Sequence, residues 1–126
     1  MTLKTFMIIT SIIAFIFGVA FIVAPTLSLN FYGVSVNVTG EFLGRYFGAS
    51  LIGTAFLAWL TRNAPASETR RAILAALFVT MLLGFLVAVY DTFAGAGNPL
   101  VWLNVGIYLT LAIGFAYFAF MKADQP

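Results

Sequence analysis

The sequence predicts an all-α fold, an integral membrane four-helix bundle of antiparallel, up-and-down spans that forms one domain over residues 1–126. The composition is the first reason, because 63% of the residues are hydrophobic and only 8% are charged, whereas a soluble domain carries about 25% charged residues. The second reason is a set of four apolar stretches, each close to the roughly 20 residues that cross a hydrocarbon core as a helix. The third is that no stretch alternates as a β-barrel strand does, and backbone polar groups in lipid must otherwise be paired within a helix.

The first expected span covers residues 6–24 and ends at Pro25. Its apolar run is longer than the roughly 7–15 residues of a signal-peptide core, so we expect a permanent anchor. We expect residues 25–41 to form a loop, because they contain one proline and two glycines, which interrupt helices. It is the longest of the expected loops. The second expected span covers residues 42–60.

The third expected span covers residues 72–94 and follows a polar turn at residues 61–71. Ser67 is the expected N-cap of this helix, since a serine hydroxyl can accept a hydrogen bond from a free backbone N–H of the first turn. The fourth expected span covers residues 99–121. It follows the tight turn "GAGN" at residues 95–98, and a proline opens it, which suits the first turn of a helix.

The basic residues predict the orientation of the chain in the membrane. With four spans, the N-terminus, the 61–71 turn and the C-terminal tail share one side. That side carries all but one of the basic residues: Lys4, Arg62, Arg70, Arg71 and Lys122. Since lysine and arginine favour the cytoplasmic side, we expect a multi-pass protein of the inner or plasma membrane with both termini in the cytoplasm.

The residue types that are missing exclude several classes of function. The chain has no cysteine and no histidine, which removes thiol chemistry, iron–sulfur ligation and the commonest metal ligands. We therefore expect no metal site and no cofactor. The basic residues are scattered and the net charge is only +2, so we also expect no nucleic-acid partner.

Most of the polarity within the expected spans lies at their outer ends, where antiparallel neighbours would bring it to one depth. The residues of this expected polar cluster are Glu41, Arg45, Asp91, Asn98 and Asn104. Small residues line helix–helix contacts in membranes. The expected packing positions are Gly44, Gly48 and Gly53 in the second span and Gly84 in the third. Arg45 shares the small-residue side of its helix and Asp91 shares that of the third, which predicts an ion pair between them.

Two interpretations of this pair stay open. Ionisable residues within a membrane are costly, so Arg45 and Asp91 are candidates for the floor of a binding pocket. Alternatively, the two charges neutralise each other and join the second and third spans, or Arg45 reaches the interface with its long side chain. The structural interpretation is slightly favoured, and Glu41, one helical turn from Arg45, competes for the same cation.

Three features resemble known families: a first span that ends in Pro25, "FYGV" at residues 31–34, and "GRYFGASLIGTAFLAWL" in the second span. With them the chain resembles small four-helix membrane proteins of bacteria and is distantly similar to the DoxX-like group and the ergosterol-biosynthesis scaffold family. The resemblance implies a four-helix bundle and a scaffold role, and it supplies no catalytic residue.

These observations favour a non-enzymatic accessory or scaffold protein that lies in the lipid bilayer and holds a lipid or an apolar ligand. Other membrane proteins, further copies of the same chain among them, are its expected partners. The alternative is a small transporter or transporter subunit that uses Arg45 and Asp91. A membrane enzyme with Glu41 or Asp91 as acid or base ranks last, because no nucleophile–base pairing is visible in the sequence.

Overall fold

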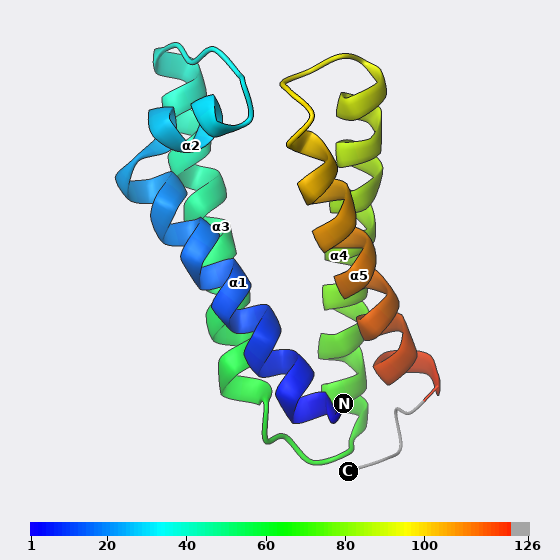
Figure 1. Cartoon of the computed structure of the whole chain (residues 1–126). Helices are drawn as coiled ribbons and strands as arrows, with labels where there is room; N and C mark the ends of the chain where they lie inside the picture. Colours follow the sequence, from blue (N-terminus) through cyan, green and yellow to red (C-terminus); the bar gives the residue numbers. More distant parts are fainter. Residues whose placement is uncertain (122–126) are drawn as a thin grey trace. The chain divides into compact units, whose positions relative to one another are not determined.

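The computed structural model describes residues 1–121, and all regular secondary structure in that range is helical (Figure 1). The chain divides into two compact units, Met1–Arg62 and Asn63–Pro126. The first unit holds helices α1 (Leu3–Val23), α2 (Pro25–Phe31) and α3 (Val38–Thr61). The second unit holds α4 (Glu68–Phe93), α5 (Val101–Ala116) and a terminal π-helical turn, η1 (Tyr117–Met121).

The long helices α1 and α3 pack side by side in the first unit, and α3 contributes mainly small residues to the contact (Figure 1). Its buried residues are Gly44, Gly48, Ala55 and Ala58. The closest approach is at Gly48, where an added Cβ would lie 2.7 Å from the carbonyl oxygen of Gly18. Small side chains allow two backbones to approach closely, and in lipid the resulting van der Waals contact drives helix association.

The sequence-based prediction of a loop over residues 25–41 is wrong in its first part, because residues 25–31 form α2. Pro25 occupies the first turn of this helix, where its missing N–H costs no hydrogen bond. The helix ends at Phe31, and Gly33, just beyond its C-cap Tyr32, has a φ of 74°, a conformation that glycine adopts without strain. There the N–H groups of Gly33 and Val34 donate to the carbonyls of Asn30 and Leu29, which is a glycine-terminated helix end.

The second long helix also begins earlier than residue 42. Asn37 caps α3, and its side-chain oxygen accepts a hydrogen bond of 2.8 Å from the backbone N–H of Gly40. This bond satisfies one of the free donors of the first turn, so the helix starts at Val38 although the three residues after it are not apolar.

In the second unit, the N-cap at Ser67 and the turn at residues 95–98 that the sequence predicts are both present. The hydroxyl of Ser67 accepts a hydrogen bond of 3.1 Å from the backbone N–H of Arg70, which starts α4 at Glu68 rather than at residue 72. At the other end, Gly95 has a φ of 78°, and Ala96 N–H donates to the carbonyl of Asp91. The glycine therefore stops α4 and begins the turn that leads to α5.

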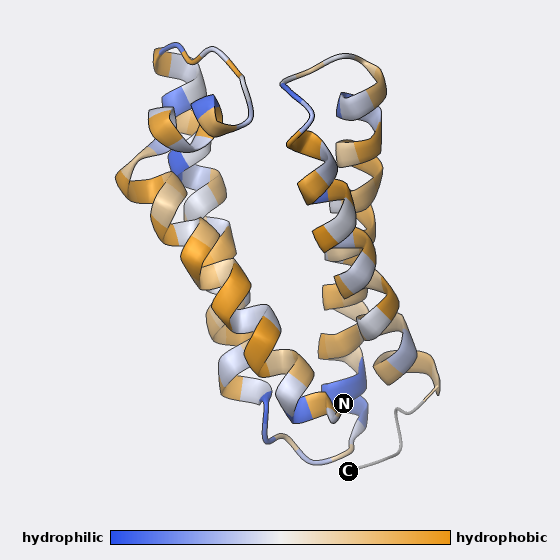
Figure 2. Cartoon of the chain, in the orientation of Figure 1, coloured by the Kyte–Doolittle hydropathy of each residue, from blue (hydrophilic) through white to orange (hydrophobic). Residues whose placement is uncertain are grey.

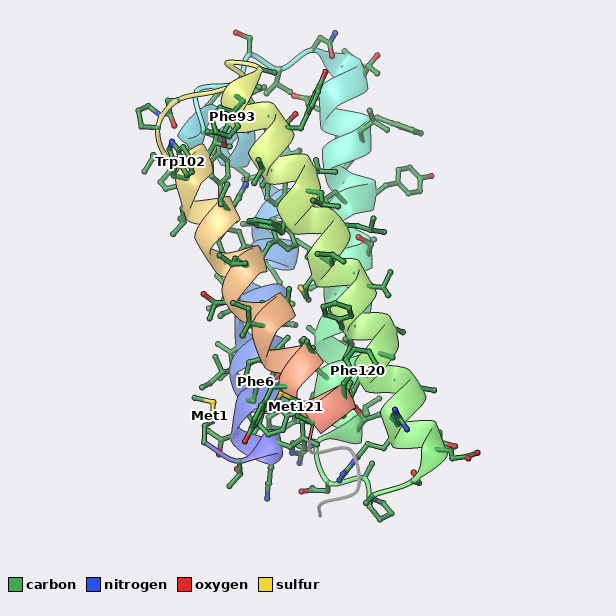
Figure 3. All side chains as sticks on the ribbon, turned by 90° about the vertical axis from the view of Figure 1, so that its right-hand side faces the viewer. Met1, Phe6, Phe93, Trp102, Phe120 and Met121 are labelled. Carbon is green, nitrogen blue, oxygen red and sulfur yellow. The ribbon has the colours of Figure 1, made fainter. Side chains whose placement is uncertain are left out.

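Three contacts along α4 join it to α5 and η1. Gly84 leaves room for an aromatic ring, since a Cβ at this position would lie 2.3 Å from Cε1 of Tyr108. Near the end of α4, the rings of Phe93 and Trp102 meet edge to face with centroids 6.2 Å apart (Figure 3). Phe78 of α4 and Phe120 of η1 make a similar contact at 5.6 Å. These contacts make the second unit a helical hairpin.

Three helical segments of residues 1–121 are long and apolar enough to cross a membrane: Leu3–Val23, Glu68–Phe93 and Val101–Met121. The expected second span, α3, has 24 residues and is long enough, but it falls short in apolar content. Arg45 and its small and hydroxylated residues account for this. Hydrophobic residues recur along the whole length of the helices (Figure 2), and many of them are exposed, as at Ile16 in α1 and Val87 in α4, which are 61% and 60% exposed. This pattern is that of a membrane protein.

Candidate functional site

The first unit contains an open cleft where α1 meets α2 and faces the start of α3. Its volume is about 510 Å³. The cleft is lined by Val23, Ala24, Pro25, Thr26, Leu27, Asn30, Glu41 and Arg45. Two residues of the predicted polar cluster, Glu41 and Arg45, therefore border one cleft, and α2 supplies most of the opposite wall.

Glu41 is tied to α2 rather than to its neighbour on α3. The hydroxyl of Thr26 donates a hydrogen bond of 2.5 Å to Oε1 of Glu41, and both side chains are half-buried. A hydrogen bond to a carboxylate is stronger than one between neutral groups. This bond therefore fixes α2 against the first turn of α3 and gives the cleft its shape.

Arg45 lies one helical turn after Glu41, and its side chain is exposed. Within residues 1–121, no ion pair joins Arg45 to Glu41, so the expected competition of Glu41 for this cation is not realised. The side of α3 on which Arg45 lies also differs from the predicted small-residue side. Gly44 and Gly48 are the buried positions of α3, and at 100° per residue Arg45 lies beside their face rather than on it. The guanidinium therefore borders the cleft instead of the contact between α1 and α3.

The four predicted packing glycines have different surroundings. A Cβ on Gly44 would lie 3.4 Å from Cβ of Pro25, and one on Gly48 would clash with α1, so both serve contacts within the first unit. Gly84 accommodates Tyr108 in the second unit. Gly53 does not take part in such a contact, because it is exposed and an added Cβ there would meet no atom within 4 Å. It lies about 140° from Gly48 around the helix, away from the buried face.

The other members of the predicted cluster, Asp91, Asn98 and Asn104, belong to the second unit. Asp91 is half-buried in the last turn of α4, and Asn104 is half-buried in α5. Asn98 lies in the turn, where its Oδ1 accepts a hydrogen bond of 2.9 Å from the backbone N–H of Leu100. An asparagine bonded two residues ahead in this way stabilises a turn. The pairing of Arg45 with Asp91 stays a prediction.

Sequence reasoning missed two members of the cleft, Thr26 and Asn30. The sequence pattern predicts a loop for both residues, because Pro25 follows directly on the first apolar span and marks its end. The signal that could have found them is a proline at the first helical position followed by a glycine just past the last one, which together delimit a short helix.

The cleft combines polar and charged groups with apolar side chains. Within residues 1–121, no group of three His, Cys, Asp or Glu side chains could hold a metal ion. The residues that face the cleft offer a hydroxyl, an amide, a carboxylate and a guanidinium beside apolar side chains. A guanidinium has five N–H donors and keeps its charge at all physiological pH values, which suits it to anionic or hydrogen-bond-accepting groups.

The chain belongs to a family described as a domain of unknown function, DUF8292, which matches residues 1–123. No curated protein and no solved structure matches the chain.

Proposed function

We propose that this member of the DUF8292 family is a small polytopic membrane protein that acts as a non-enzymatic accessory or scaffold protein and holds an amphipathic lipid in the cleft of its first unit. The observation that carries the proposal is the composition of the cleft. Apolar side chains such as Val23 and Leu27 line it together with the exposed guanidinium of Arg45. A ligand with an acyl chain and a polar headgroup matches both surfaces.

The hydrogen bond that Glu41 accepts supports the proposal that Arg45 binds a lipid headgroup. Because Thr26 donates to its carboxylate, Glu41 is stabilised as part of the wall, and Arg45 keeps its donors for a ligand. A phosphate or carboxylate headgroup would accept two parallel hydrogen bonds from a guanidinium. No nucleophile–base pair accompanies this cation in the sequence, which is why we propose binding rather than catalysis.

The same proposal includes the membrane topology. We propose that α3 crosses the bilayer as a fourth span, in a four-helix bundle with both termini in the cytoplasm. Arg45 lies seven residues after the start of α3 at Val38, or about 10 Å along the helix axis. A long side chain at that depth can reach the interfacial region, which lowers the cost of placing a charge in a span.

Lipid co-purification tests the proposal. The protein is purified in a mild detergent, and native mass spectrometry records the lipids that stay bound to the wild type and to Arg45→Gln. Since one cation near an anionic surface contributes about fivefold in affinity, we expect lipid retention to fall by about that factor in Arg45→Gln. The matched control is Arg71→Gln, which removes an exposed arginine outside the cleft.

Equal lipid retention by Arg45→Gln and the wild type would contradict a role of Arg45 in the cleft. A lone monomer that retains neither lipid nor a protein partner would contradict the wider assignment as an accessory protein.

A second candidate function is that of a small transporter or transporter subunit in which Arg45 and Asp91 take part. The observation that favours it is the place of Asp91 in the last turn of α4, where the helix dipole disfavours a negative charge. A carboxylate kept at such a position is a candidate for a functional role. On this hypothesis Asp91→Asn abolishes uptake or efflux while the protein remains folded and inserted, and transport that survives the substitution counts against it.

A further inference from the structure

A second concave surface lies between α1 and α3, towards the end of the first unit that is remote from the cleft. It is an open groove of about 280 Å³. We call it the Trp59 groove, and its lining residues are Ser11, Ile12, Phe15, Ile16, Ala55, Phe56 and Trp59.

The Trp59 groove is lined almost entirely by apolar side chains. Its one polar side chain, Ser11, is buried and donates a hydrogen bond of 2.7 Å to the carbonyl of Ile8 in its own helix. Ala55 is also buried, whereas Ile16 and Phe56 are 61% and 51% exposed and form the walls. Because α1 has the length and composition of a membrane span, an acyl chain can enter this groove from the bilayer without leaving an apolar environment.

Two basic side chains, Arg62 and Lys4, lie near one end of the groove. The guanidinium carbon of Arg62 lies 3.8 Å from the centroid of the Trp59 ring, and Nη1 of Arg62 donates to the carbonyl of Trp59 at 2.6 Å. This bond uses one of five N–H donors and leaves the others for an anion. The first turn of α1 lies beside the last turns of α3 (Figure 1), and Lys4 in that first turn is exposed. The one carboxylate side chain of residues 1–62, Glu41, belongs to the cleft near the opposite end.

We propose that the Trp59 groove binds an anionic glycerophospholipid, with one acyl chain between α1 and α3 and the phosphate on Arg62. The stacking of the guanidinium on Trp59 fixes the cation at the end of an apolar channel. That arrangement matches an anion joined to a hydrocarbon chain. A zwitterionic lipid offers the same chain, but its headgroup also carries a positive charge towards Arg62 and Lys4. The site shares no residue with the cleft around Arg45.

Tryptophan fluorescence gives a local readout, because the chain has only two tryptophans, Trp59 and Trp102. In a Trp102→Phe background, Trp59 reports the groove alone. The protein is reconstituted into bilayers in which the brominated acyl chains are carried either by phosphatidylglycerol or by phosphatidylcholine. We expect brominated phosphatidylglycerol at equal mole fraction to occupy the site with about a fivefold preference.

Substitutions of Arg62 distinguish the effect of its positive charge from the effect of its stacking on Trp59. Arg62→Gln is expected to lower the preference to about one, whereas Arg62→Lys, which keeps the charge, is expected to retain most of it. Arg71→Gln serves as a matched control and leaves the preference unchanged, as does Arg45→Gln, so this result is independent of the proposed cleft ligand. Circular dichroism checks that each variant is folded.

Equal quenching by the two brominated lipids in the Trp102→Phe protein overturns the proposal. Absence of quenching by either lipid, together with cross-linking of two chains through Ile16→Cys, overturns it as well and assigns the groove to a second copy. A preference that persists in Arg62→Gln shows that another group selects the lipid and equally contradicts the assignment.

Discussion

At the scale of single residues, Gly48 decides how closely α1 and α3 approach each other. An added Cβ would lie 2.7 Å from the carbonyl oxygen of Gly18 and 3.0 Å from the backbone nitrogen of Ile22. Both atoms belong to the backbone of α1, so no side-chain rotation can relieve the clash. The two helices must move apart to accept any side chain at this position.

We therefore predict that Gly48→Ala destabilises the protein by about 1–3 kcal/mol, the usual cost of forcing extra volume into a tight contact. The measurement is unfolding in mixed micelles with increasing sodium dodecyl sulfate, followed by circular dichroism. Gly53→Ala is the matched control, because it makes the same chemical change on the same helix where a Cβ would meet no atom within 4 Å. If the two variants unfold at the same detergent fraction, the close approach at Gly48 does not exist.

At the scale of elements, the short helix α2 depends on its tie to α3. A helix of seven residues has little stability of its own, because forming the first turn is costly. The hydrogen bond from Thr26 to Glu41 compensates for that cost, and Gly44 allows α2 to pack closely, since an added Cβ there would lie 3.4 Å from Cβ of Pro25. Since α2 forms one wall of the cleft, its order and the order of the cleft are linked.

We predict that Thr26→Val, which preserves the side-chain shape and removes the donor, weakens this tie by about 1.5–3 kcal/mol, as expected for a hydrogen bond to a charged group. Hydrogen exchange read by mass spectrometry should then show faster exchange in residues 25–33 with little change in α4. The control is Thr80→Val, whose hydroxyl bonds only to the carbonyl of Ala76 in its own helix. Unchanged exchange in residues 25–33 would show that α2 is held by other contacts.

The elements also show how far the sequence could predict this molecule. Helices that carry an apolar run and a polar cap were predictable, as at Ser67, and the turn at Gly95 followed from its glycines. Hydrophobic periodicity does not mark the start of α3, because only Val38 among its first four residues is apolar. The place of Arg45 was missed for a different reason. Arg45 borders the cleft because α2 forms the opposite wall. A contact between two separate helices has no local pattern in the sequence from which it could be predicted.

At the scale of the whole molecule, the length and composition of α3 determine how many times the chain crosses the bilayer. Three helices meet the composition of a span, and α3, although less apolar, has 24 residues, or about 36 Å at 1.5 Å per residue. That length exceeds a hydrocarbon core of about 30 Å. If α3 crosses, the segments before and after it lie on opposite sides of the membrane. If it does not, they lie on the same side.

Single cysteines distinguish these two arrangements without background, because the chain contains no cysteine of its own. Ser35 and Ala66 are exposed positions just before and just after α3. In intact cells, we predict that an impermeant maleimide labels Ser35→Cys, whereas Ala66→Cys reacts only after the membrane is permeabilised. This follows from the basic residues that flank Ala66, Arg62 and Arg70 among them, which favour the cytoplasmic side. Labelling of both positions from the same side would mean that α3 does not span, and Arg45 would then lie at the surface with no burial cost to explain.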